Sequence, residues 1–384
     1  MTAVIEDIRF FPLRSPLNPP ASFAWGSAAE RNVGLVRVLI GGQEGWGETS
    51  VTFPLWSLEE RSLTVRNLAP LFHGAPIETV DDIDVVCERV RKATAPLTHL
   101  WSPVAISAAV GAIEMALTDA LLKRLHRSAL DEFHGTGNPL PLYAVGFQGN
   151  ADRIAEQAAA AISAGYRAVK IRVGFDPDRD LRLLRTVREV VGDSPILVDA
   201  NMAWNRDDAA DAIRAMSRYS PAWIEEPLAP DDVEGLAALR RRFPDIPFAA
   251  GENCYDERQL NHLVDAEAVD VLMPDLARCG GFLVALRAAR RANKRGIRVS
   301  PHHYASDIGF SADTVLAAAL GDGQRQKIPV MLLRDVSYWP LRENVAGHAF
   351  TTDTGVVTPY AGEGLSPSPD PAVLNRWTID ADGV

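Results

Sequence analysis

Three acidic residues in the middle of this 384-residue chain each end a short apolar run: Asp199, Glu225 and Glu252. If these runs are neighbouring strands, about 4.8 Å apart, their carboxylates converge at one edge of a sheet. Unpaired carboxylates would repel one another there, and a hard divalent cation with octahedral oxygen preference removes that repulsion. Each acid alone could instead cap a helix or form an ion pair. The three in register predict a Mg²⁺ site.

Two cations end the preceding apolar run. Lys170 and Arg172 lie two residues apart, so on a strand both side chains point to the same face. We expect them to hold the carboxylate of a small-molecule substrate and to offset negative charge that develops during its reaction. The alternative is that they form ion pairs with Asp199 or Glu225 and have no other role.

A carboxylate and an imidazole, Asp275 and His302, end the next two runs. A carboxylate beside an imidazole fixes its tautomer and raises its basicity, so we predict a dyad with His302 as general base, facing Lys170 across the metal. A lone histidine at a strand end is usually structural, but Asp275 one strand earlier favours the dyad. Glu226 and His303 alternate to the other face. We expect Glu226 to support the acids and His303 to stay outside the chemistry.

These groups together predict one kind of reaction. The metal and the cations bind a carboxylate, the base removes the proton from its α-carbon, and an enediolate forms. Such a proton is very weakly acidic, so electrostatic stabilisation must supply most of the barrier reduction.

Repeated units must position these residues. From Lys170 to His302 the successive chemical residues are separated by 29, 26, 27, 23 and 27 positions, close to one strand-plus-helix unit of a parallel barrel of roughly 250 residues in eight units. The intervening segments are amphipathic: in 179–191 an apolar residue recurs every three positions, at Leu181, Leu184, Val187 and Val190. An open sheet would gather its site from two or three strands at one crevice. The pattern therefore predicts an α/β barrel.

The composition bounds the remaining possibilities. A chain of this length exceeds one compact core, so two domains are expected. The net charge of −11 includes no basic stripe, so we expect no nucleic-acid partner. Apolar runs look too short to span a membrane, and no signal peptide precedes the acidic Glu6 and Asp7, so we expect no membrane partner. Three widely spaced cysteines fit a reducing cytoplasm and argue against disulfides.

The chain is expected to form three parts. Residues 1–135 read as an α+β domain, with strands in 4–13 and 32–40 and helices in 58–134. Residues 136–340 form the barrel, beginning with a strand at 140–145 and ending with one at 329–333. Residues 341–384 are loop-rich and are expected to return to the first domain.

Two segments near residues 16–26 and 50–57 are read as loops that carry aromatic residues. Trp25 lies in the first of them, and Phe53 and Trp56 lie in the second. Aromatic rings on loops suggest a lid over a ligand. They could equally fill a domain interface.

The barrel motifs together resemble the enolase superfamily, and in particular its mandelate racemase-like branch. The resemblance covers nearly the whole chain and rests on these stretches: Val169-Lys170-Ile171-Arg172-Val173-Gly174, Val198-Asp199-Ala200-Asn201, Trp223-Ile224-Glu225-Glu226-Pro227, Gly251-Glu252-Asn253, Met273-Pro274-Asp275 and His302.

The resemblance implies a (β/α)7β TIM-type barrel whose N-terminal α+β capping domain, completed by the C-terminal tail, covers the barrel mouth with two loops. It implies that Mg²⁺ is the cofactor and that Asp275 and His302 are catalytic with Lys170. Arg172, Asn201, Trp25 and Phe53 are then expected to contact the substrate. A homo-oligomer is expected by family analogy only.

Two positions depart from the family pattern. Racemases of this branch carry Lys-x-Lys, whereas the second position here is Arg172, and a guanidinium is too strongly protonated to act as a base. Racemisation needs a base on each face, so a simple racemase is disfavoured. On the eighth strand Leu333 stands where many relatives have a glutamate. Arg334 could compensate, but strand alternation points it elsewhere.

With one usable base, β-elimination of water fits best. We therefore predict a hydro-lyase acting on a hydroxy acid, similar to acid-sugar dehydratases. An epimerase, racemase or cycloisomerase that uses the same enediolate is the first alternative. A metal-binding protein with impaired catalysis is the second.

Overall fold

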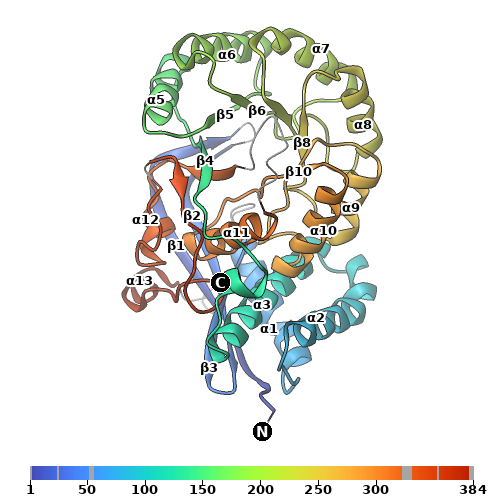
Figure 1. Ribbon diagram of the computed structural model, residues 1–384, viewed down its shortest axis with the longest axis vertical. Coiled ribbons are helices and arrows are strands. Elements are labelled where there is room, and N and C mark those ends of the chain that lie inside the picture. Colours follow the sequence, from blue (N-terminus) through green and yellow to red (C-terminus); the bar gives the residue numbers. More distant parts are fainter. Residues whose placement is uncertain (1, 24–25, 52–55, 322–330, 353, 380–384) are drawn as a thin grey trace.

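The computed structural model describes residues 2–23, 26–51, 56–321, 331–352 and 354–379. Two parts lie one above the other in Figure 1. Helices surround a curled sheet in the upper part, and an antiparallel sheet with its own helices forms the lower part.

The antiparallel sheet of the capping domain has the order β1 (Ile5–Phe23), β2 (Gly26–Ile40) and β3 (Gln43–Thr49). The expected loop at 16–26 is wrong for the described residues, because β1 continues to Phe23 and pairs with Gly26 of β2. The pairing register shifts between Pro16 and Ala21. Prolines lack the N–H that a regular ladder needs, so a shift of register is the usual way to accommodate them. The predicted contact residue Trp25 lies outside the described residues.

Three long helices complete the capping domain: α1 (Ser57–Phe72), α2 (Val80–Thr94) and α3 (Pro103–Arg124), with η1 (Ala95–His99) between the last two. Strand β3 lies so close to α3 that a Cβ at Gly45 or Gly47 would come within 2.2 Å of a carbonyl oxygen of α3. Only glycine permits this approach. The sheet therefore packs directly on α3.

Helix α3 differs from the expectation that apolar runs are too short to span a membrane. It is the one described helix that is long and apolar enough to cross a membrane, contrary to the expectation that no segment is. However, 89% of its most apolar window is buried inside the protein. Its apolar character is accounted for by the core that it forms between β3 and the barrel helices.

The barrel-like sheet consists of parallel strands in the order β10-β9-β8-β7-β6-β5-β4-β11. Their bounds are β4 (Leu140–Val145), β5 (Ala168–Arg172), β6 (Ile196–Asp199), β7 (Trp223–Glu225), β8 (Phe248–Ala250), β9 (Val271–Leu272), β10 (Arg298–Val299) and β11 (Leu332–Asp335). The hydroxyl of Ser300 donates to the carbonyl of Met331 at 2.5 Å and so joins the two ends of this order. The eighth strand begins at Leu332 among the described residues, later than the predicted 329.

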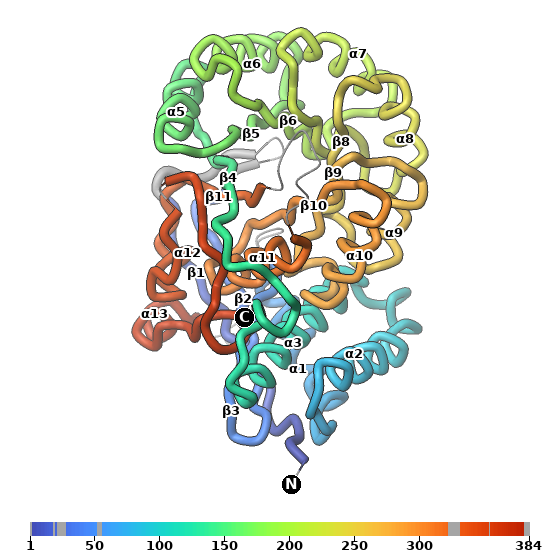
Figure 2. The backbone as a smooth tube through the Cα atoms, in the orientation of Figure 1, coloured from blue at the N-terminus to red at the C-terminus, as the bar shows by residue number. Residues whose placement is uncertain are grey.

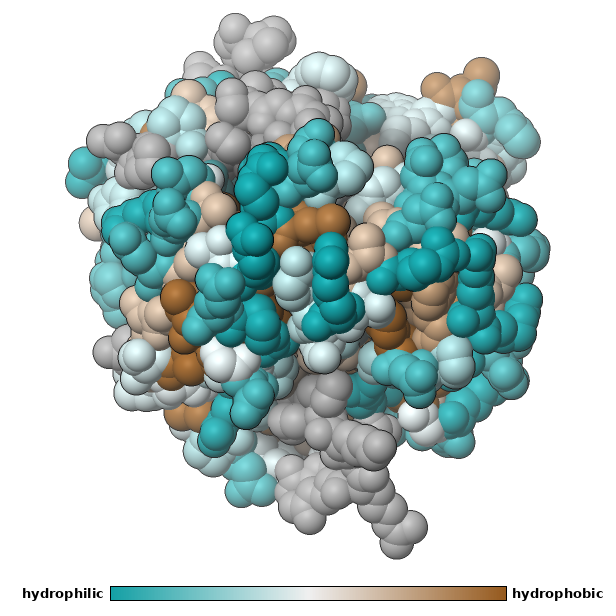
Figure 3. Space-filling model, turned by 90° about the horizontal axis from the view of Figure 1, so that it is seen from above, coloured by the Kyte–Doolittle hydropathy of each residue, from teal (hydrophilic) through white to brown (hydrophobic). Residues whose placement is uncertain are grey.

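Helices surround this sheet: α4 (Ala129–Glu132), α5 (Ala151–Ser163), α6 (Pro177–Val191), α7 (Arg206–Met216), η2 (Ser217–Tyr219), α8 (Val233–Arg242), α9 (Glu257–Asp265), α10 (Phe282–Lys294) and α11 (Asp307–Ala319). The stripe predicted on α6 is partly wrong: Leu184 and Val187 are buried, but Val190 is 49% exposed and Val191 is buried instead. A period of 3.6 rather than 3 explains the drift. The outer face, seen from above in Figure 3, is accordingly mostly hydrophilic.

The C-terminal tail returns to both parts. It contains α12 (Pro340–Asn344), β12 (Val356–Val357) and α13 (Pro371–Trp377). The N–H of Ile379, the last residue that the structure describes, donates to the carbonyl of Pro12 at 2.9 Å, and α13 lies beside β1, as Figure 2 shows. Strand β12 instead pairs antiparallel with β4 of the barrel.

Side chains that point inward fill the barrel below its mouth. Tyr143, Leu197, Trp223 and Met273 belong to one buried cluster, and the rings of Tyr143 and Trp223 meet edge to face with centroids 5.6 Å apart. This packed floor leaves the carboxyl ends of the strands as the open end. All three cysteines are buried and free, as expected.

Candidate active site

Strand register brings the predicted residues to one end of the barrel. Arg172 pairs with Asp199, and Asp199 pairs with Glu225, across β5, β6 and β7. Asp275 and His302 form an isolated parallel bridge three residues beyond the ends of β9 and β10. Each run therefore ends at the same level, and the chemical side chains converge from different strands.

Lys170 lies among the acids. Its Nζ is 2.8 Å from Oε1 of Glu225 and 3.2 Å from Oδ2 of Asp199, and all three side chains are buried. Burial opposes the charge of Lys170, but Asp199 and Glu225 outweigh it and hold the pKa of the ammonium well above its ordinary value. The ion pairs considered as the alternative role of Lys170 are thus present. The contact leaves Lys170 protonated, as a group that binds negative charge must be.

His302 is held through both ring nitrogens. Its Nδ1 lies 2.8 Å from Oδ2 of Asp275, and its Nε2 lies 2.9 Å from Oε2 of Glu252. The N–H of Ala277 donates to the other oxygen of Asp275 at 2.9 Å, which fixes that carboxylate. Burial lowers the pKa of His302, but Glu252 and Asp275 together raise it to about 9. The ring is therefore oriented by Asp275, with Nε2 on the side of the acids.

The three acids fit a hard cation chemically, although their rotamers are turned to other partners. In the described part of the chain, no group of three or more acidic, histidine or cysteine side chains is already arranged to hold a metal ion. Glu225 is directed to Lys170, and Glu252 to His302. Oδ2 of Asp199 is buried and lies 3.2 Å from Nζ of Lys170, but it accepts no hydrogen bond from the described residues. Three carboxylates with such an oxygen at consecutive strand ends suit Mg²⁺.

The backbone turns sharply after two of these acids. Asn201 and Met202, after Asp199, and Glu226, after Glu225, have positive φ angles of 45°, 64° and 39°. Non-glycine residues in this region cost energy and cluster at functional sites. The N–H of Asn201 donates to Oδ1 of Asp199 at 3.0 Å, so Asn201 holds an acid in place. It is not among the residues that line the cavity described below, and its expected role in substrate binding stays a prediction.

Two further residues, Glu226 and Arg278, lie next to the acid cluster and help to hold it in place. Glu226 accepts a hydrogen bond from Nδ2 of Asn253 at 2.7 Å, and burial followed by the charges of Glu252 and Glu225 raises its pKa. This contact agrees with the expectation that Glu226 supports the acids and does not itself react. Arg278, which the sequence did not single out, has its Nε 3.3 Å from Oδ2 of Asp275 and its Nη1 3.7 Å from Oε1 of Glu252. The one sequence feature that could have identified Arg278 was its position three residues after Asp275.

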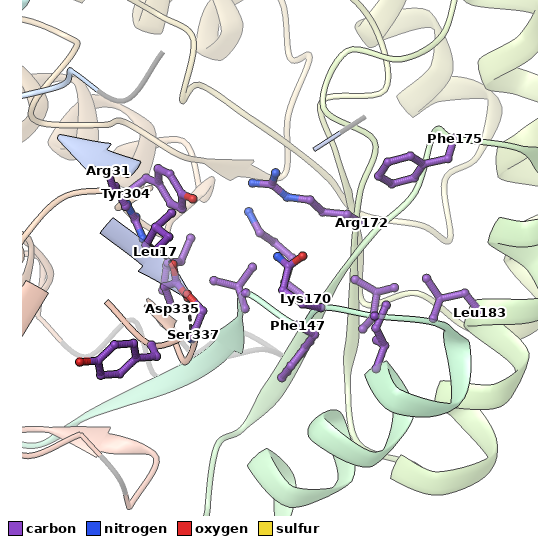
Figure 4. Close-up of a pocket in the computed structure, with 18 of the residues that line it drawn as sticks. Leu17, Arg31, Phe147, Lys170, Arg172, Phe175, Leu183, Tyr304, Asp335 and Ser337 are labelled. Carbon is purple, nitrogen blue, oxygen red and sulfur yellow. Dashed lines mark hydrogen bonds and ion pairs between the residues drawn. The ribbon is translucent and has the colours of Figure 1, made fainter. Parts of the chain in front are cut away.

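A cavity of about 360 Å³ opens beside Lys170 and His302. In Figure 4, Lys170 and Arg172 extend side by side into the space between two walls. One wall is mostly polar and includes Arg31, Tyr304, Asp335 and Ser337, and the other is apolar and includes Phe147, Phe175 and Leu183. The cavity therefore places an acid–base pair next to room for a small molecule.

The capping domain contributes Arg31 to this cavity. Its Nη1 lies 2.9 Å from Oδ2 of Asp335, and its guanidinium stacks 3.5 Å from the ring of Tyr304 and 3.9 Å from that of Trp339. Sequence reasoning missed Arg31, Tyr304 and Asp335. Nothing in the alternation of β2 distinguishes Arg31, because its partners are about 300 residues away.

The remaining predicted positions fall as follows. Leu333 lines the cavity. Arg334 points away from it, as expected, and pairs with Asp307 at 2.5 Å. His303 is bound to Asp313 at 2.7 Å and does not line the cavity. Phe53 lies outside the described residues, and the nearby Trp56 is 70% exposed.

Comparison with known families gives two matches that together span most of the chain. Residues 153–373 match the model described as "Enolase C-terminal domain-like". Residues 5–131 match the model described as "Mandelate racemase / muconate lactonizing enzyme, N-terminal domain".

Three relatives have different activities. The chain is 27% identical over 325 residues to N-succinyl-L-Arg/Lys racemase of Bacillus cereus, covering 83% of this chain and 82% of the relative. It is 31% identical to D-galactarolactone cycloisomerase of Agrobacterium fabrum, covering 56% of this chain and 58% of the relative. It is 32% identical to L-talarate/galactarate dehydratase of Salmonella typhimurium, covering 59% and 57%. The chain thus spans little more than half the length of the last two relatives.

Solved structures show the same fold over the whole chain. A member of the enolase superfamily from Polaromonas sp. JS666 has a TM-score of 0.87 and 27% identity, covering 99% of this chain and 98% of that one. A mutant of L-talarate/galactarate dehydratase liganded with Mg and L-glucarate has a TM-score of 0.85 and 24% identity, covering 99% and 93%.

Proposed function

Because this chain belongs to the enolase superfamily, in its mandelate racemase/muconate lactonizing enzyme branch, we propose that it abstracts the proton α to a carboxylate and then eliminates water. The proposed class is a Mg²⁺-dependent hydroxy-acid or acid-sugar dehydratase. The observation that carries the proposal is the pairing of His302 with Asp275 at the edge of a cavity shared with Lys170.

The proposed metal ligands are Asp199, Glu225 and Glu252. Mg²⁺ bound there would supply Lewis-acid stabilisation of a substrate carboxylate. Lys170 and Arg172 add positive charge on the cavity side of these acids. Their fixed positions mean that little reorganisation is needed when negative charge develops on the substrate.

The proposed base is His302. Asp275 holds Nδ1, so Nε2 is the nitrogen that takes the α-proton, and Glu252 must turn away from it when it binds the metal. The electrons of the Cα–H bond then form the enediolate. Collapse of the enediolate forms the Cα–Cβ double bond and breaks the Cβ–O bond, and the departing oxygen takes up one proton and leaves as water. Tautomerisation of the enol gives a 2-keto acid.

The choice of dehydration over racemisation depends on Arg172. A guanidinium stays protonated at neutral pH, so the second base of a racemase is missing at this position. A cycloisomerase needs only one base for proton abstraction and is the second candidate, favoured by the similarity to D-galactarolactone cycloisomerase. Analysis of the product separates the two, because dehydration alone yields a 2-keto acid with loss of water.

The experiment is a screen of acid sugars and simpler 2,3-dihydroxy acids with Mg²⁺. Each compound is incubated in deuterated water, and both 2-keto acid formation and α-deuterium incorporation are measured. A 2-keto acid from at least one compound supports the proposal. Deuterium exchange with a rearranged or epimerised product supports the alternatives. Mg²⁺ binding without exchange on any compound supports a protein with impaired catalysis.

A further inference from the structure

Tyr304 has no assigned role in the proposed reaction, yet it lines the cavity in which that reaction would occur. It follows His302 by two residues and lines the same cavity as His302, Lys170 and Arg172. In Figure 4 its hydroxyl points from the polar wall toward the guanidinium of Arg172. The phenol thus faces the space that a substrate bound beside Lys170 would occupy.

The ring of Tyr304 is held firmly. Arg31 from the capping domain stacks on it at 3.5 Å, and Arg31 is itself fixed by its ion pair with Asp335 at 2.9 Å. The N–H of Ser337 donates to Oδ1 of the same carboxylate at 2.8 Å. The phenol is therefore positioned by contacts from β2 and β11 rather than by its own loop alone.

The two other candidate proton donors, Lys170 and His302, both contact carboxylates of the acid cluster. Nζ of Lys170 donates to Glu225 at 2.8 Å and lies 3.2 Å from Asp199, so its protons serve the acid cluster. His302 contacts carboxylates with both nitrogens. After it has taken the α-proton, Nε2 faces the α-carbon, whereas the departing oxygen is on the next carbon. A separate proton donor that lines the cavity is therefore better placed to protonate this oxygen.

We propose that Tyr304 is the general acid that protonates the departing β-hydroxyl. This inference rests on the proposed dehydration. The Cβ–O bond breaks as the phenol O–H proton moves to that oxygen, and water leaves. A phenolate remains, and it regains a proton from solvent or from the proton that His302 holds. No oxidant or further reactant is needed.

The charged groups around Tyr304 are compatible with both the protonated phenol and the phenolate. Burial raises the pKa of the phenol, so it holds its proton at neutral pH. Arg31, Arg172 and Arg342 act in the opposite direction and would stabilise the phenolate, while Asp335 opposes them. Arg172 in place of a lysine then has a use: it supports the acid without competing as a base.

The test compares two steps in Tyr304→Phe. We expect the dehydration rate to fall by about 10²–10⁴, the usual contribution of general acid catalysis. We expect α-proton exchange with deuterated water to stay within about threefold, since His302 performs it. Tyr219→Phe is the matched control, because Tyr219 lies on η2 and does not line the cavity, and both steps should be unchanged in it.

A substrate analogue sharpens the test. Chloride leaves without a proton, so a β-chloro analogue of the accepted hydroxy acid should be converted by Tyr304→Phe nearly as fast as by the unaltered enzyme. Equal loss with the hydroxy and chloro substrates would overturn the inference, as would an unchanged dehydration rate. If Tyr304→Phe does not fold, fluorotyrosine at 304 preserves the ring. Because its hydroxyl is more acidic, the alkaline limb of dehydration should move to lower pH while that of exchange does not, and an unmoved limb would also refute the proposal.

Failure of the proposed function would look different. It would show as absence of exchange and of 2-keto acid in the unaltered enzyme with every acid tested. A failure of the Tyr304 assignment requires an active unaltered enzyme, so the two outcomes cannot be confused.

Discussion

Glu48 of β3 accepts hydrogen bonds from the N–H and the hydroxyl of Ser306, at 2.9 and 2.7 Å, four residues after His302. The same carboxylate accepts the N–H of Gly309 at 2.9 Å. It thus caps the N-terminus of α11, where a negative charge is favourable. Through this buried contact the capping domain holds the segment that carries the base and Tyr304.

Removing that carboxylate should loosen the segment. Glu48→Ala leaves the donors of Ser306 and Gly309 buried without an acceptor, which costs about 2–4 kcal/mol of unfolding free energy. Urea denaturation measures this cost, and activity on the accepted substrate should fall with it. Glu44→Ala, which removes a half-exposed surface pair with Arg37, is the control and should change stability by less than 1 kcal/mol. Equal stability of the two variants would contradict the role of Glu48.

The assignment of His302 as the base predicts loss of α-proton exchange in His302→Asn. Asparagine preserves a polar side chain but cannot accept a proton at neutral pH, so exchange into deuterated water should fall at least 10²-fold. Proton NMR of the recovered substrate measures it. His73→Asn changes an exposed histidine of the capping domain and serves as control. Exchange that survives in His302→Asn would assign the base to Lys170.

The Mg²⁺ assignment predicts that Asp199→Asn weakens cation binding by at least tenfold, because a neutral amide replaces an oxygen donor of the acid cluster. Calorimetric titration with Mg²⁺ measures the affinity directly, independently of activity. Asp231→Asn, at a surface acid after β7, should bind Mg²⁺ like the unaltered protein. Removal of divalent cations with a chelator should abolish exchange, and added Mg²⁺ should restore it. Unaltered affinity in Asp199→Asn would remove this residue from the site.

The arginine at position 172 leads to a prediction about the stereochemistry of the recovered substrate. A lysine there can give up its proton, which a guanidinium does not do at neutral pH. Arg172→Lys should therefore gain α-epimerisation of slowly reacting acids, detectable as two diastereomers of the recovered substrate by NMR. Arg179→Lys, at the partly exposed rim of the cavity, is the matched control and should yield one diastereomer. One diastereomer from both variants would mean that position 172 does not face the α-carbon.

The buried carboxyl of Glu114 should make the unfolding free energy of the protein depend on pH. It is buried in α3, where it accepts hydrogen bonds from Thr118 and from the N–H of Leu283, and burial raises its pKa to about 7. A raised carboxyl pKa gives stability that is complete below pH 4.5 and is lost as pH rises through about 7. The shift corresponds to about 3 kcal/mol.

Glu114→Gln removes this titration while keeping an acceptor for Leu283. Unfolding free energies from urea denaturation at pH 4.5, 6 and 8 should therefore fall less steeply in Glu114→Gln than in the unaltered protein. Glu88→Gln, on the half-exposed face of α2, should retain the full decline. Parallel curves for all three proteins would show that Glu114 does not titrate in this range.

Much of the fold followed from the sequence because it depends on local patterns. The period of two places Lys170 and Arg172 on one face, and parallel strands of similar length bring Asp199, Glu225 and Glu252 to one end. The strand β4 has the predicted bounds. The dyad was foreseeable for the same reason, since Asp275 and His302 end consecutive strands.

Tertiary structure alone decided what surrounds these residues. Arg31 meets Asp335 across 304 positions of sequence, and Glu48 meets Ser306 across 258, and no periodicity encodes such distances. The hairpin of β1 and β2 also runs past the prolines that suggested a loop, because its pairing with a long partner strand outweighs their local preference. Sequence thus determined which groups can react and at which end of the barrel they lie. Only folding determined which partners hold them, because those contacts depend on how two domains pack.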